Sequence, residues 1–156
     1  MEHSESKGFW FSDLDVIWCR PPEILNTDEN LIYAQNDAWK KSGNLHFCSG
    51  IMFFPNSQKV RKELSELFEI HVKTIESKVL TPDEPIFNSF FVLNNSSPRV
   101  NYLDSDKYVI GHRIIYFLIS SRTRISKVVA FHINYVIGDQ KKSLVAMAIL
   151  SRLEGK

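Results

Sequence analysis

Two aspartates, Asp13 and Asp15, stand one residue apart at the end of an apolar run, and apolar residues resume at Val16. A carboxylate beside buried apolar residues is costly unless it is paired or bound to a cation. Carboxylate oxygens are good ligands for hard cations such as Mg²⁺ and Mn²⁺. The pair therefore suggests a divalent-metal site, although an Asp-x-Asp pattern alone is also typical of a solvated turn or helix cap.

A histidine occupies a comparable position later in the chain. His132 follows residues 128–131, an apolar run that predicts a buried strand. If the two strand ends meet at one edge of a sheet, His132 could join Asp13 and Asp15 as a ligand, because imidazole binds manganese and later metals well. The alternative is a hydrogen-bonded histidine at a strand end.

The segment after His132 combines polar residues that could bind phosphate: Asn134, Gly138, Lys141 and Lys142. A glycine that frees backbone N–H groups, with lysines nearby, can hold phosphate oxygens. The alternative is a turn that leads into the solvated start of a helix. Lysine is mildly unfavourable at a helix N-terminus, which slightly favours the phosphate interpretation.

Two further positions could contact a ligand. Gly50 interrupts an apolar strand pattern, and such a glycine often marks a bulge or a close approach of the backbone to a ligand. Asp83 could be a sugar-binding or catalytic carboxylate, and it could equally be the N-cap of a short helix with Pro85 in its first turn.

Strands alternate with helices along the chain, which predicts an α/β fold. The longest helix is expected at 59–79, where apolar residues recur at steps of three and four. Residues 114–119 are apolar and could form either a strand or a helix. The expected strands are 9–12, which should be buried, 16–19, 31–34, 46–54, 100–103 and 128–131. One further helix is expected to start near residue 83, and another is expected at 142–153.

The bulk properties describe one globular domain over residues 1–156, with residues 1–8 expected to be disordered. The net charge of +1 predicts no strong attraction to nucleic acid. No membrane span, signal peptide or anchor is evident, so the chain is expected to be soluble. Cys19 and Cys48 are read as free buried thiols, and a bridge between them stays open.

Taken together, these motifs resemble the nucleotide-diphospho-sugar transferase family, which includes plant and algal cell-wall arabinosyl-, galactosyl- and xylosyltransferases. The resemblance rests on the order of five elements over residues 9–142. They are Ser12-Asp13-Leu14-Asp15-Val16-Ile17-Trp18 followed by Pro21; Gln35-Asn36-Asp37; Cys48-Ser49-Gly50-Ile51-Met52; Asp83-Glu84-Pro85-Ile86-Phe87-Asn88, with Glu84 where the family has Gln; and His132-Ile133-Asn134 with Gly138 and Lys141 or Lys142.

The resemblance implies a GT-A-like mixed sheet flanked by helices. In the family, nucleotide-binding βαβ units precede the Asp-x-Asp strand, so the chain would be the C-terminal part of the fold with those units mostly missing. Asp13, Asp15 and His132 would ligate Mn²⁺ or Mg²⁺. Asn134, Gly138, Lys141 and Lys142 would contact the donor, which the resemblance implies is a UDP-sugar. Gly50 would also bind the donor, with Asp83 and Glu84 as the catalytic residues on the sugar and acceptor side.

The family resemblance further implies a retaining, metal-dependent glycosyltransferase with a glycan or glycoprotein acceptor, located in the Golgi lumen or secretory pathway. A non-catalytic remnant that binds a glycan or a partner is the alternative. An aspartate-nucleophile phosphatase ranks last, because Ile17 stands where that chemistry expects a threonine.

Overall fold

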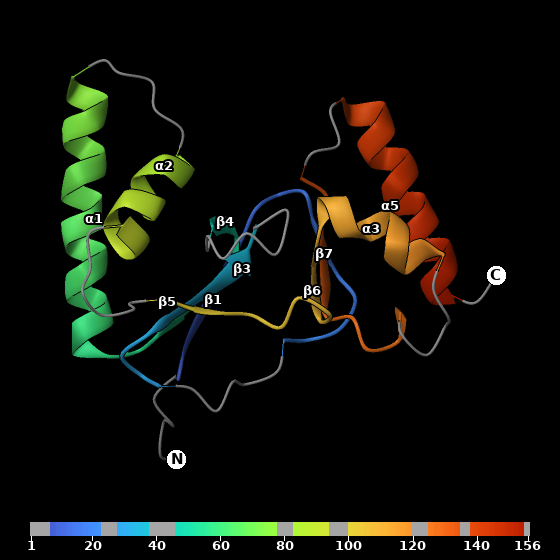
Figure 1. Ribbon diagram of the computed structural model, residues 1–156, viewed down its shortest axis with the longest axis horizontal. Coiled ribbons are helices and arrows are strands. Elements are labelled where there is room, and N and C mark those ends of the chain that lie inside the picture. Colours follow the sequence, from blue (N-terminus) through green and yellow to red (C-terminus); the bar gives the residue numbers. More distant parts are fainter. Residues whose placement is uncertain are drawn as a thin grey trace, which may run out of the picture. The chain divides into compact units, whose positions relative to one another are not determined.

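The computed structural model describes residues 7–22, 28–37, 46–77, 83–93, 100–119, 125–134 and 138–154. The chain divides into two compact units, residues 1–11 with 25–102 and residues 12–24 with 103–156. Each unit contains a sheet and helices of its own (Figure 1). The predicted α/β class is therefore confirmed, whereas the single domain expected over 1–156 stays a prediction.

The first unit is built on a four-stranded mixed sheet with the order β1-β4-β3-β5. Strand β3 runs antiparallel to β4 and parallel to β5. The strands are β1 (Gly8–Ser12), β3 (Ile32–Asn36), β4 (Phe47–Pro55) and β5 (Val100–Tyr102). Each of the four strands begins within one residue of the position predicted from the sequence.

The β3–β4 pairing is irregular at the position of Gly50. Ala34 of β3 pairs with Met52 of β4, but the next residue of β3, Gln35, pairs with Cys48. Residues 49–51 therefore bulge out of the pairing while they stay buried. This confirms the irregularity that a glycine inside a strand pattern predicts.

Among its described residues, this unit has three helical segments. Helix α1 (Gln58–Glu76) is capped by Ser57, whose hydroxyl oxygen accepts a hydrogen bond from the Val60 N–H at 3.2 Å. Helix α2 (Asp83–Asn88) continues directly into the π-helical segment η1 (Ser89–Leu93). The core between helices and sheet contains Ile32, Ala34, Phe47, Met52, Phe54, Val60, Leu67, Phe91 and Val100.

The expectation that residues 9–12 form a buried strand is wrong, because Phe9 and Phe11 of β1 are exposed and Trp10 and Ser12 are only partly buried. Phe9 and Phe11 are 54% and 44% exposed, because β1 is the terminal strand of its sheet. Their side chains instead help to line an apolar cavity of about 400 Å³ against α1 and β4. Its other lining residues are Met52, Phe54, Leu64, Leu67, Phe68, His71, Val72, Ile75 and Phe87.

The second unit has a three-stranded sheet with the order β2-β7-β6. The strands are β2 (Val16–Trp18), β6 (Tyr108–Ile110) and β7 (Ala130–His132). Helices α3 (Gly111–Leu118) and α5 (Asp139–Glu154) contact each other (Figure 1). The buried core includes Val109, Ile114, Phe117, Val128, Phe131, Ile133 and Ile149.

The apolar run 114–119, which the sequence left open, forms most of α3. Phe117 of this helix is fully buried, and its ring meets that of Phe131 edge-on at 6.3 Å between centroids. Tertiary packing therefore decides between the two options here. Across the described residues, none of the helices combines the length and the apolar character needed to span a bilayer.

Candidate metal and nucleotide-sugar site

Strand pairing in the second unit brings the two aspartates to His132. Strand β2 begins directly after Asp15, and its first residue, Val16, pairs antiparallel with His132, the last residue of β7. The Ile133 N–H then donates a 3.0 Å hydrogen bond to the carbonyl of Asp15. The turn that carries both carboxylates is thereby held next to the imidazole.

The three side chains converge on one point. His132 Nε2 lies 3.3 Å from Asp15 Oδ1 and 3.6 Å from Asp13 Oδ2. One ligand atom from each residue falls within 4.8 Å of the other two. The His132 side chain is 4% exposed and that of Asp13 is 41% exposed. The cluster is therefore anchored on a buried imidazole and is open to solvent on the Asp13 side.

The donor set suits a divalent metal. Two carboxylate oxygens and one imidazole nitrogen are a combination that manganese and neighbouring metals accept, and three protein ligands leave room for phosphate or water. The structure brings the three predicted ligands, Asp13, Asp15 and His132, together. That they bind a metal stays a prediction.

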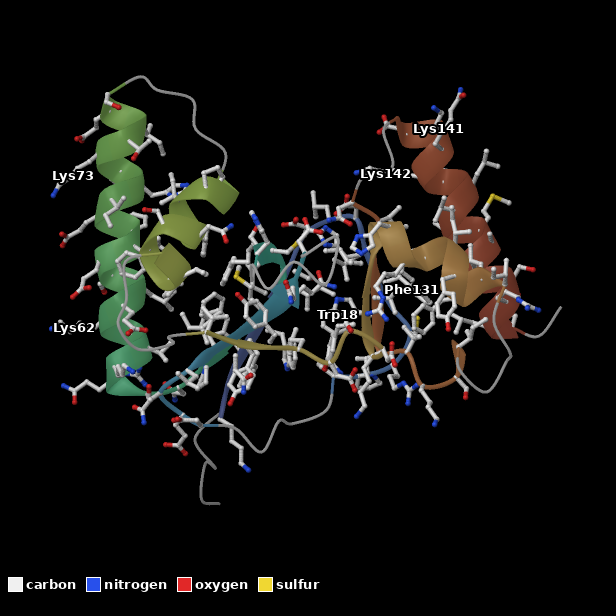
Figure 2. The ribbon with its side chains drawn as sticks, in the orientation of Figure 1. Trp18, Lys62, Lys73, Phe131, Lys141 and Lys142 are labelled. Carbon is white, nitrogen blue, oxygen red and sulfur yellow. The ribbon has the colours of Figure 1, made fainter. Side chains whose placement is uncertain are left out.

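Lys142 adds a positive charge to this cluster. Its ammonium nitrogen donates a hydrogen bond to Asp15 Oδ2 at 2.6 Å. Figure 2 shows Lys142 extending from the first helical turn of α5 toward the segment with Asp13 and Asp15. The exposed Lys141 extends away from that segment. Of the two lysines proposed from sequence, Lys142 is the one in contact with a predicted metal ligand.

The charge balance favours ionised Asp15. Partial burial by itself would raise the pKa of this carboxyl group. The hydrogen bond from Lys142, the electrostatic effect of the neighbouring His132 and the positive charge of Lys142 outweigh that effect, so the pKa of Asp15 lies below its ordinary value of 3.8. Asp15 is therefore a carboxylate over the whole physiological pH range.

The predicted phosphate segment has a partly structural role. The Asn134 side-chain oxygen accepts a 2.8 Å hydrogen bond from the Gly111 N–H at the start of α3. A Cβ atom at Gly111 would lie 2.0 Å from the Asn134 carbonyl oxygen, so this position requires glycine. Gly138 has a φ of 96° just before α5, as expected for a turn. Phosphate contact by Asn134 and Gly138 stays a prediction.

The remaining predicted residues belong to the first unit. Gly50 lies in the β4 bulge, and Asp83 and Glu84 are the first two residues of α2. The side chains of Asp83 and Glu84 lie outside the part of the chain that the structure describes. Their predicted catalytic role and the predicted ligand contact of Gly50 stay predictions.

Three residues support these elements through contacts that the sequence patterns do not predict. Gly111 and Asn88 each make a close contact with backbone distant in sequence. Arg20 donates hydrogen bonds to the carbonyls of Ser126 and, at 2.9 Å, Val128, and so ties the end of β2 to the segment before β7. Such long-range side-chain to backbone contacts have no local periodicity that could reveal them.

Cys19 and Cys48 are not joined by a disulfide. Cys48 is buried, as expected, whereas Cys19 is only partly buried. Burial raises the pKa of the Cys19 thiol to about 11, although the Arg20 charge acts in the opposite direction. The Cys19 thiol is therefore almost entirely protonated near neutral pH.

The comparison with known families matches residues 5–145 to the nucleotide-diphospho-sugar transferase family. The comparison with curated proteins yields no match. Among solved structures, the chain is similar to the galactosyltransferase LgtC in complex with donor and acceptor sugar analogs, at 15% identity and a TM-score of 0.54. It is also similar to the glycosyltransferase GlyE of Streptococcus pneumoniae TIGR4, at 14% identity and a TM-score of 0.56.

These alignments cover nearly all of this chain but only part of the relatives. They include 95% of this chain and 62% of the LgtC chain, and 96% of this chain and 42% of the GlyE chain. At these identities the similarity shows the fold, and it confirms the GT-A-like architecture of sheets flanked by helices. Because the family match spans most of the sequence, the chain belongs to the nucleotide-diphospho-sugar transferase family.

Proposed function

We propose that this chain acts in metal-dependent glycosyl transfer, from a nucleoside-diphosphate sugar to a glycan or glycoprotein acceptor. The observation that carries the proposal is the convergence of Asp13, Asp15 and His132 on one point. Family membership supports a sugar-nucleotide donor. The two carboxylates and the imidazole supply the ligands that would attach the donor diphosphate through a cation.

A bound Mn²⁺ or Mg²⁺ would supply Lewis-acid stabilisation of the charge on the departing nucleoside diphosphate. The protein contributes a pre-arranged ligand set, because β-strand pairing orients His132 and Asp15 before any ligand arrives. Lys142 contributes a further positive charge beside one of these carboxylates, that of Asp15. A lysine there can bind phosphate oxygens once its contact with Asp15 is released.

The finer parts of the proposal rest on the family pattern. They comprise a UDP-sugar donor, retention of anomeric configuration, Golgi or secretory localisation and a relationship to cell-wall glycan transferases. Gly50 would contact the donor sugar, with Asp83 and Glu84 as catalytic groups on the acceptor side. Because the chain spans 62% and 42% of its structural relatives, the activity of the whole protein is part of this proposal.

The proposal is tested by calorimetry with MnCl₂ and UDP, followed by transfer assays with UDP-galactose, UDP-glucose, UDP-xylose and UDP-arabinose. We expect Mn²⁺ to bind, UDP to bind only when Mn²⁺ is present, and EDTA to abolish UDP binding. The double variant Asp13→Asn with Asp15→Asn should lose both Mn²⁺ binding and Mn²⁺-dependent UDP binding, because it removes two of the three proposed metal ligands.

Glu66→Gln is the matched control. Glu66 is an exposed carboxylate on α1 whose contact with Lys62 is 3.8 Å long, and its loss should leave binding unchanged. Mn²⁺ and UDP binding of wild-type strength in the Asp13, Asp15 double variant would contradict the proposed site. Metal-dependent UDP binding without turnover of any of the four donors would instead favour the non-catalytic binding role.

A further inference from the structure

The side chain of Asn88 forms hydrogen bonds with both backbone groups of Phe47, the first residue of β4, as the backbone of a neighbouring strand would. Its Oδ1 accepts a hydrogen bond from the Phe47 N–H at 2.8 Å, and its Nδ2 donates one to the Phe47 carbonyl at 3.0 Å. The two residues are 41 positions apart. A carboxamide offers one donor and one acceptor group in a fixed plane, so asparagine satisfies both backbone groups of Phe47 at once.

Aromatic rings on either side of Asn88 reinforce this contact. The Phe47 ring stacks on Phe87 with 5.2 Å between centroids and an interplanar angle of 16°. It also stacks on Phe91 at 5.8 Å and 17°. Phe47 and Phe91 are essentially fully buried. The junction between α2 and η1 is therefore fastened to one residue of β4 by two hydrogen bonds and two ring contacts.

This fastening matters because α2 cannot hold its own position. A helix of six residues is too short to be stable by itself. Its first residues, Asp83 and Glu84, lie about 6–8 Å along the helix axis from Asn88, at 1.5 Å per residue. Gly50 lies about 10 Å along β4 from Phe47, at 3.3 Å per residue. The Asn88–Phe47 contact thus links two elements that carry predicted donor and acceptor residues.

We propose that Asn88 is a positioning residue that orients the first turn of α2, with Asp83 and Glu84, relative to the Gly50 bulge of β4. This inference rests on the proposed function, because it assigns that orientation to sugar transfer. The π-helical segment that follows Asn88 is consistent with it, since such segments are frequent at functional sites.

Asn88→Asp is the most informative variant, because it keeps the size of the side chain and replaces the amide donor by an oxygen that repels the Phe47 carbonyl. With UDP-galactose and Mn²⁺, we expect kcat for donor turnover to fall at least tenfold while KM for the donor changes less than twofold. Mn²⁺ affinity should be unchanged, because Asp13, Asp15 and His132 belong to the other unit.

Phe91→Leu is the matched control, because it weakens the ring stack and leaves both hydrogen bonds in place. Asn88→Gln, which retains the carboxamide, should recover part of the lost kcat. If Asn88→Asp and Phe91→Leu lower kcat equally at equal loss of thermal stability, Asn88 has only a structural role and the inference is overturned.

Hydrogen exchange separates this result from the proposed function. In the full chain, Asn88→Asp should speed amide exchange in residues 86–88 at least tenfold and leave exchange in α5 unchanged. If the wild-type chain turns over no donor, the proposed function fails. The amide exchange rates of α2 in the wild type and in Asn88→Asp still test whether Asn88 holds α2 in place. Unchanged exchange in α2 would overturn the positioning role whether or not the chain is active.

Discussion

The ammonium nitrogen of Lys142 lies 2.6 Å from the Oδ2 atom of Asp15, although 127 positions separate the two residues. The other oxygen of the same carboxylate lies 3.3 Å from His132 Nε2. Asp15 therefore contacts a lysine and a histidine at once. A divalent cation that binds this carboxylate must compete with the charge of Lys142.

Replacing Lys142 with methionine should tighten Mn²⁺ binding. The Lys142–Asp15 pair is partly exposed, and such a pair is worth up to about 1 kcal/mol, which corresponds to about fivefold in the dissociation constant. The same variant should bind UDP more weakly in the presence of Mn²⁺, because it removes the lysine proposed to contact the donor phosphates. Both constants are measurable by calorimetry.

Lys141→Met is the control for this experiment, because Lys141 is the exposed neighbour on the same helical turn. It should leave the affinity for Mn²⁺ unchanged. Weaker Mn²⁺ binding in Lys142→Met would mean that the lysine orders Asp15 for the metal and does not compete with it.

The metal-free protein should lose stability in acid through Asp15. The folded pKa of this group is lower than its ordinary value of 3.8, so the unfolded chain takes up the proton first as the pH falls. Its contribution to the free energy of unfolding is complete above about pH 5 and is lost progressively as the pH drops through 3.8 toward the folded pKa. Denaturant titrations between about pH 5 and pH 3 in EDTA measure this loss.

The comparison with Lys142→Met isolates the effect of the ion pair. Without the lysine, the pKa of Asp15 moves upward, and the free energy of unfolding should depend less steeply on pH in this range. Lys141→Met should follow the wild-type curve. Superimposable curves for wild type and Lys142→Met would show that the pair adds nothing to acid stability.

Gly111→Ala should destabilise the second unit. The added Cβ would meet the Asn134 carbonyl oxygen at 2.0 Å and the Asn134 side-chain oxygen at 2.6 Å. Relieving this overlap moves the segment after His132, at a cost of about 1–3 kcal/mol typical of overpacking. Because that segment adjoins a predicted metal ligand, Mn²⁺ affinity should also fall.

Gly138→Ala provides the contrast, since a Cβ there would meet nothing within 4 Å although φ is 96°. It should lower stability by about 1 kcal/mol, through backbone strain alone. Thermal melting and Mn²⁺ titration of both variants make the comparison. Wild-type stability of Gly111→Ala would refute the close packing of Gly111 against Asn134.

Cys19 should react slowly with iodoacetamide near neutral pH. Its pKa of about 11 leaves almost no thiolate at pH 8, and the thiolate is the reactive form. The rate of alkylation in the folded Cys48→Ser variant should keep rising with pH beyond 9. In denaturant the same thiol should react with the pH dependence of an ordinary cysteine. A plateau of the folded rate near pH 8 would contradict the raised pKa.

Local sequence patterns are sufficient for much of the secondary structure. The three- and four-residue spacing of apolar side chains predicts a helix at 59–79, and α1 spans Gln58–Glu76. The glycine inside the apolar run 46–54 predicts the irregularity observed in β4. These features depend on backbone geometry and on one buried face, so neighbours in sequence encode them.

Other features needed contacts between distant residues. Residues 114–119 could not be assigned from sequence because a short apolar run fits a buried strand or a buried helix, and the packing of Phe117 against Phe131 selects the helix. The exposure of Phe9 and Phe11 could not be inferred either, because it depends on the place of β1 at the end of its sheet.

The candidate site divides in the same way. The residue types and their order along the chain were enough to nominate Asp13, Asp15 and His132, because metal chemistry restricts which side chains can act as ligands. That these side chains meet, and that Lys142 rather than Lys141 joins them, was decided by the antiparallel pairing of β2 with β7 and by the helical phase of α5. Distances between residues over a hundred positions apart are set by strand register and packing, and no local pattern in the sequence encodes them.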